Sequence, residues 1–157
     1  MFPFLLALAL PAAQDLPPAR VIDGIEMETL SWGRATSRWS IDAQGNGQVT
    51  RPEDKKLVTR SFAAGTSGFR RVRVLLGRVE ARGGLATGCT ARMTDQPYGS
   101  VRWLRRSGST VELKFDRGCR SSATRSAMAD MQAADALVAG WGQAGTIVET
   151  RELENQR

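Results

Sequence analysis

One stretch of twelve residues carries side chains of the kind that bind calcium: DAQGNGQVTRPE, residues 42–53. It begins with an acid, has Gly47 at its sixth position and ends with a glutamate, as the loop of an EF-hand does. Calcium binding through this loop is therefore one hypothesis for the function. The oxygen ligands would come from Asp42, Gln44, Asn46, Gln48 and Glu53.

The residues around this stretch argue for a different structure. An EF-hand loop follows a helix with an apolar face, but Arg38 and Arg34 stand one and two helical turns before the loop. The preceding letters SRWSID instead alternate between polar and apolar residues, which is the period of a strand. At the third position of the loop, where an EF-hand usually has Asp or Asn, this chain has Gln44. We therefore interpret residues 42–48 as a hairpin turn and predict neither a metal site nor a cofactor.

Catalytic chemistry has few residue types available in this chain. There is no histidine, which removes serine–histidine and cysteine–histidine nucleophiles and the most frequent general base. Carboxylates remain, and a pair drawn from Asp95, Asp116 and Asp130 could act as in a glycosidase. A carboxylate-dependent hydrolase of the cell envelope is thus the alternative to a protein without catalytic activity.

The amino terminus predicts export. Residues 4–10 are an apolar run, followed by Pro-Ala-Ala, which resembles a signal peptide with a cleavage zone of small residues. The run is too short to serve as a transmembrane anchor. We expect a signal peptide at 1–13, a single domain at 14–148 and a charged, frayed tail at 149–157, in a periplasmic or secreted protein.

The two cysteines, Cys89 and Cys119, are expected to form a disulfide in an exported chain. Two cysteines without histidine cannot supply the four ligands of a structural zinc site. The bridge would connect the loop after the first helix to the start of the last helix.

The net charge of +6 comes almost entirely from arginine. A helix predicted to begin at Thr66 or Ser67 and to stop at Gly83 carries several of these arginines away from its apolar stripe. No aromatic residue is interleaved with them to stack on bases, so we expect a solvated face and no nucleic-acid partner. The arginines are Arg70, Arg71, Arg73, Arg78 and Arg82.

The order of elements predicts an α+β fold. The segments 25–33, 36–42, 47–51 and 57–63 have strand character, and a second hairpin follows the first helix. Ser121 or Ser122 can cap a last helix with an apolar stripe. We therefore predict an antiparallel sheet of about six strands with two helices packed on one face, in the order ββββ-α-ββ-α.

The second hairpin, SVRWLRRSGSTVELKF, allows its register to be predicted. Two apolar sets, one in each strand, lie at odd positions: Val101 and Trp103, and Val111, Leu113 and Phe115. They share one face only if the connection has an odd number of residues. A three-residue connection ending in Gly108 places Trp103 opposite Val111. The alternation leaves a face free of helices as a possible partner surface, with Arg38, Arg102 and Glu112 pointing outward.

These turn motifs, the GNG hairpin and the D-x-P turn in TDQPYG, resemble those of small exported bacterial α+β proteins of unknown function. The architecture is also similar to that of exported inhibitor proteins that bind through a sheet face. The motifs of this resemblance carry no catalytic residue. A small, rigid, disulfide-closed exported protein fits a binding, inhibitor or immunity-type module of the cell envelope, which would bind a protein partner through the exposed sheet face or the basic helix face.

Overall fold

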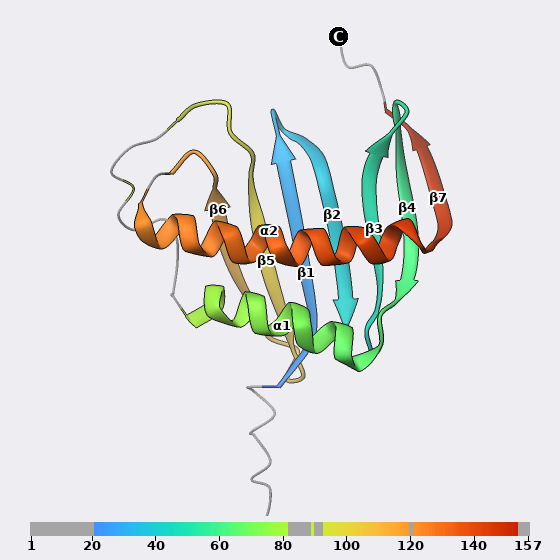
Figure 1. Ribbon diagram of the computed structural model, residues 1–157, viewed down its shortest axis with the longest axis horizontal. Coiled ribbons are helices and arrows are strands. Elements are labelled where there is room, and N and C mark those ends of the chain that lie inside the picture. The colour runs from blue at the N-terminus through green and yellow to red at the C-terminus, as the bar shows by residue number, and fades with distance from the viewer. Residues whose placement is uncertain (1–20, 82–88, 90–92, 120, 154–157) are drawn as a thin grey trace, which may run out of the picture.

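The computed structural model describes residues 21–81, 89, 93–119 and 121–153, which form a sheet and two helices (Figure 1). The predicted signal peptide and the predicted helix stop at Gly83 lie outside this part of the chain. The elements are β1 (Ile22–Ser31), β2 (Arg34–Asp42), β3 (Asn46–Glu53), β4 (Lys56–Ala63), α1 (Gly65–Ala81), β5 (Tyr98–Arg105), β6 (Thr110–Asp116), α2 (Ser122–Gln143) and β7 (Thr146–Glu152).

The sheet has seven strands in the order β6-β5-β1-β2-β3-β4-β7, and every neighbouring pair is antiparallel. Both helices cross the same face of this sheet, and α1 and α2 lie side by side (Figure 1). The α+β class is therefore confirmed, with one strand more than the predicted six. Neither of the two described helices lies over the opposite face (Figure 1).

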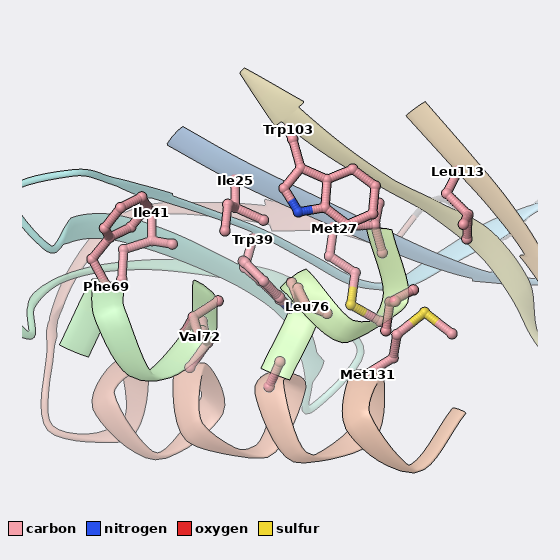
Figure 2. Close-up of a cluster of buried hydrophobic side chains, with 14 of the residues drawn as sticks. Ile25, Met27, Trp39, Ile41, Phe69, Val72, Leu76, Trp103, Leu113 and Met131 are labelled. Carbon is pink, nitrogen blue, oxygen red and sulfur yellow. The ribbon is translucent and has the colours of Figure 1, made fainter. Parts of the chain in front are cut away.

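The core lies between the sheet and the helices (Figure 2). Alternate residues of the central strands supply it, among them Met27, Trp39 and Trp103, which are almost fully buried. The strand period places their neighbours on the uncovered face. The helical stripes predicted from the sequence are also buried: Phe69, Val72, Leu76 and Val79 of α1, and Ala127, Met131, Ala134 and Val138 of α2.

The last strand corrects the predicted frayed tail. Residues 146–152 form β7, which pairs with β4 over the register Lys56 to Glu152 through Ser61 to Thr146 and lies at the edge of the sheet. The β-branched residues Thr146, Ile147, Val148 and Thr150 suit a strand. Lys56 Nζ lies 3.1 Å from Glu152 Oε1. The charged residues are therefore the exposed side chains of an edge strand, which discourage pairing with other chains. Residues 154–157 lie outside the described part.

The second hairpin has the predicted register. Trp103 lies opposite Val111, and the Arg105 amide donates to the Ser109 carbonyl at 2.9 Å, which closes the three-residue connection. Gly108 has a φ of 82°, in the left-handed region that glycine tolerates best. The first four strands begin one to three residues earlier than predicted, and β3 continues to Glu53. The segment predicted as strand 25–33 ends at Ser31, because the next two residues form the β1–β2 turn.

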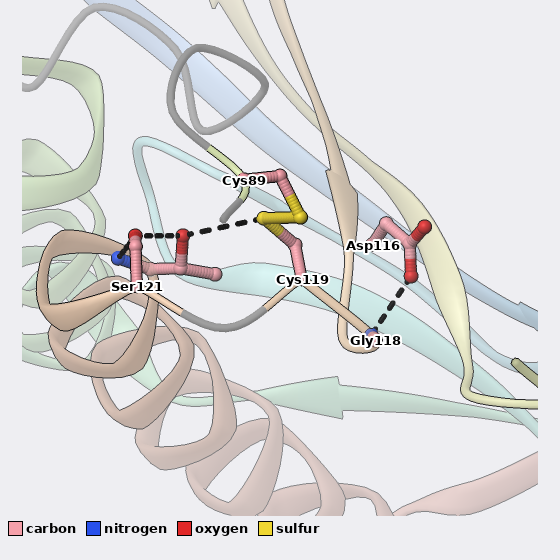
Figure 3. Close-up of a disulfide and its surroundings, with 6 residues drawn as sticks. Cys89, Asp116, Gly118, Cys119 and Ser121 are labelled. Atoms are coloured by element: carbon pink, nitrogen blue, oxygen red, sulfur yellow. Dashed lines mark hydrogen bonds between the residues drawn. A yellow bond between two sulfur atoms is a disulfide. The ribbon is translucent and has the colours of Figure 1, made fainter. Parts of the chain in front are cut away.

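The two cysteines form the predicted disulfide, with their Cα atoms 5.3 Å apart (Figure 3). Cys119 is buried and lies two residues before Ser121, the N-cap of α2. The Ser121 side chain caps that helix by accepting a hydrogen bond from the Thr124 amide at 3.1 Å. The first helix begins at Gly65, one residue before the cap predicted at Thr66.

A half-buried carboxylate connects α2 to the sheet. Asp135 Oδ1 accepts hydrogen bonds from Ser37 Oγ at 3.0 Å and from Trp39 Nε1 at 3.1 Å. Its other oxygen, Oδ2, accepts from an Arg51 Nη2 at 2.7 Å. One carboxylate therefore receives three donors from β2 and β3, which fixes α2 over the centre of the sheet.

Candidate binding face

The uncovered face of the sheet is polar and hollowed at its centre. The hollow has a volume of about 310 Å³ and extends over β5, β1, β2 and β3. Ser40, Thr50 and Ser100 contribute short hydroxyl side chains to it, and longer charged side chains surround them. The side chains that line the hollow from this face are Glu26, Glu28, Arg38, Ser40, Gln48, Thr50, Ser100 and Arg102.

Two ion pairs cross the hollow. The strand register places Arg102 opposite Glu26, with Nη2 and Oε2 2.7 Å apart. Arg38 lies opposite Glu28 and donates from Nε to Oε1 at 3.0 Å. The arginine side chains are 52% and 63% exposed, and exposed ion pairs of this kind contribute only about 0 to 1 kcal/mol to stability. The guanidinium groups are therefore available to a partner at little loss of stability.

The three residues predicted for a partner face lie on this surface. Arg38, Arg102 and Glu112 come from β2, β5 and β6, and Arg102 stands opposite Glu112 in the sheet. Sequence reasoning missed Glu26 and Glu28, which lie on β1 between the two arginines. The letters IEMET alternate these glutamates with the apolar residues Ile25 and Met27. This alternation indicates that the glutamates lie on the face away from the core.

The twelve residues of the apparent calcium loop do not form a loop in the structure. Asp42 Oδ1 accepts hydrogen bonds from the Gln44 and Asn46 amides, both at 2.9 Å, and so stabilises the β2–β3 turn. The predicted hairpin is thus confirmed. Glu53 lies at the far end of the eight-residue strand β3. The hydrogen bond from Arg60 to its carboxylate lowers the pKa of Glu53.

We therefore expect millimolar calcium to leave the melting temperature of the protein unchanged. A ligand that binds only the folded state raises that temperature by mass action, and here the first and last ligands of the presumed loop are separated by a whole strand. Differential scanning calorimetry with calcium and with EDTA checks this. A calcium-dependent rise that Asp42→Ala abolishes would contradict the assignment of these residues to a hairpin.

The candidate catalytic carboxylates are divided between two places. Asp95 and Asp116 line one cavity of about 280 Å³ at an end of the sheet. Asp130 belongs to α2, where its Oδ1 lies 3.5 Å from an Arg78 guanidinium nitrogen of α1. Within the residues that the structure describes, no group of three or more acidic, cysteine or histidine side chains could hold a metal ion.

Two further observations concern the class of protein. Neither helix among the described residues combines the length and the apolar character needed to cross a membrane. Comparisons with protein-family models, with curated proteins and with solved structures find no match.

Proposed function

We propose that this protein is a non-catalytic binding module of the cell envelope, which docks a partner protein on the uncovered face of its sheet. The observation that carries the proposal is the hollow between Arg38 and Arg102. Arginine is enriched at the energetic centres of protein interfaces, because its planar group forms several hydrogen bonds at once. Short hydroxyl side chains between the two arginines leave room for side chains of a partner to enter.

The character of the hollow favours a protein over a small molecule. Sites for small molecules are lined mainly by apolar and aromatic side chains and enclose most of their ligand. Here the lining side chains on this face are polar or charged, and the hollow is partly open to solvent. Each guanidinium has five donors, of which its glutamate uses one or two, so the remaining donors suit carboxylates of a partner.

Export is part of this proposal. A disulfide between residues 30 positions apart persists in an oxidising compartment, such as the periplasm or the outside of the cell. The apolar run near the amino terminus supports the same location. An inhibitor or immunity-type role fits a rigid, bridged domain that presents one preformed face.

The test compares two double variants that lose the same charge. Arg38→Gln with Arg102→Gln changes the sheet face, and Arg70→Gln with Arg71→Gln changes the exposed face of α1. We expect the sheet variant to bind the captured envelope partner about a hundredfold more weakly, because two arginines at an interface centre contribute about 1.4 kcal/mol or more each. The helix variant should bind within about threefold of the parent, as expected for a solvated face.

The measurement is affinity capture from an envelope extract, followed by titration of the captured protein against each variant. Melting temperatures of both variants control for folding. Loss of binding in the helix variant alone would overturn the choice of face. Failure to capture a partner, together with turnover of a glycan or ester that Asp116→Asn abolishes, would replace the binding module by the carboxylate-dependent hydrolase.

A further inference from the structure

Three large apolar side chains are exposed together at one end of the sheet. Trp32 in the β1–β2 turn is 75% exposed, while Met93 and Tyr98 are 43% and 41% exposed. All three line the cavity of about 280 Å³ that Asp95 and Asp116 also line. The β1–β2 turn and the chain leading into β5 lie at the same end of the sheet in Figure 1. Isolated exposed apolar residues are common, but a cluster around a cavity marks an interaction site.

The backbone holds this cavity in a conformation that its residues do not favour. Trp32 has a φ of 52° at the first position of a two-residue turn, where asparagine or glycine is preferred. Asp95, which also lines the cavity, has a φ of 66°. A bulky residue at positive φ is strained by about 1 to 3 kcal/mol, and such residues are concentrated at functional sites. The turn thus presents an indole to solvent where a smaller residue would fit better.

The described side chains that line the cavity are acidic or uncharged, although the protein as a whole is basic. The chain has 22 lysine and arginine residues and a net charge of +6, yet the described residues that line this cavity include two aspartates and no basic residue. Asp116 Oδ1 accepts a hydrogen bond from the Gly118 amide at 2.8 Å, which orients that carboxylate (Figure 3). Aromatic faces and carboxylates are the two groups that attract organic cations.

We propose that this cavity binds the guanidinium group of an arginine side chain from the partner protein. A planar guanidinium stacks on an indole or phenol ring and donates hydrogen bonds to carboxylates, so it matches both groups at once. Tyr98 belongs to the uncovered face of the sheet, where it stands opposite Leu30 of β1, so the cavity continues the surface that docks the partner. The proposal rests on that docking function for the source of the arginine.

A small probe tests the cavity without the partner. The mature protein, labelled with ¹⁵N, is titrated with N-acetylarginine amide and with N-acetylcitrulline amide, its uncharged isostere, while the indole N–H signals are followed by NMR. Trp32 is the most exposed of the four tryptophans, and Trp39 and Trp103 are buried. We expect its signal to move and saturate at millimolar arginine amide, with citrulline amide at least about tenfold weaker. Equal shifts with both probes, or none, would overturn the proposal.

Two variants separate binding from structure. Trp32→Asn places a residue suited to positive φ in the turn, so we expect the melting temperature to stay level or rise while the response to arginine amide at Asp95 and Tyr98 disappears. Asp95→Asn should weaken the probe about tenfold. Full binding by Trp32→Asn, or a fall in its melting temperature, would show that Trp32 has a structural role instead.

The sheet-face variant serves as the matched control for the probe. Arg38→Gln with Arg102→Gln should keep the full response to arginine amide, because neither arginine lines this cavity. A probe that fails to bind overturns the arginine site alone. A partner that binds the sheet-face variant as tightly as the parent overturns the docking face alone. The two failures are therefore distinguishable.

Discussion

Replacing Asp135 by alanine should lower the free energy of unfolding by about 2 to 4 kcal/mol. The carboxylate receives donors from Ser37, Trp39 and Arg51, and its side chain is only 20% exposed. Without it, the buried Trp39 N–H has no acceptor and Arg51 loses its counter-charge. Arg51 is 35% exposed, so water compensates part of the loss of its counter-charge. The change in the free energy of unfolding should therefore not exceed the upper end of the stated range. Urea unfolding followed by circular dichroism measures the change.

The control is an exposed residue of the same helix. Gln132→Ala should change the free energy of unfolding by less than about 0.5 kcal/mol, because exposed substitutions away from such features are nearly neutral. The free energy of unfolding of Asp135→Asn should lie between those of the two alanine variants, because the amide keeps one acceptor oxygen but is uncharged. Equal stability of Asp135→Ala and Gln132→Ala would contradict the role of Asp135 in holding α2 on the sheet.

The elements with a strong local period could be predicted from the sequence. The apolar stripes of both helices follow from the spacing of their residues. The register of the β5–β6 hairpin follows from the odd number of residues in its connection. The strand β7 could not be predicted in this way, because its side chains are all exposed and its pairing depends on β4, about 90 residues earlier. The link from Asp135 to Trp39 is equally non-local, since it depends on how α2 lies across the sheet.

In the candidate site, too, some residues can be predicted from a local pattern and others depend on the arrangement of the strands. Arg38, Arg102 and Glu112 were predicted to share a face, because strand alternation alone assigns each of them to the side away from the helices. Their neighbours Glu26 and Glu28 required the strand order, in which β1 lies between β2 and β5. Trp32 lies in the segment 25–33, whose residue pattern predicts a strand, and a tryptophan is not expected at the positive φ of a tight turn.

Removing the disulfide should lower the free energy of unfolding by about 3 to 4 kcal/mol, the loop-closure value for a separation of 30 residues. The bond closes a loop that contains the whole β5–β6 hairpin, so its loss frees that segment in the unfolded chain. Cys89→Ala with Cys119→Ala avoids an unpaired thiol and a new polar group. Urea unfolding of this variant and of the oxidised parent gives the difference, and free thiols on the intact, non-reduced protein would contradict the bond itself.

The reduced parent separates the constraint from packing. Cys119 is buried, and its sulfur lies 3.8 Å from Thr124 Oγ1 at the start of α2, so the alanine variant also loses contacts in the folded state. If the constraint on the unfolded chain dominates, the reduced parent and the double alanine variant should agree within about 1 kcal/mol, the size of one lost buried methylene-sized contact. Nearly full stability in the reduced parent would instead assign the loss to packing around Cys119. In that case the disulfide would add no stability, and an oxidising compartment would give the exported protein no energetic advantage.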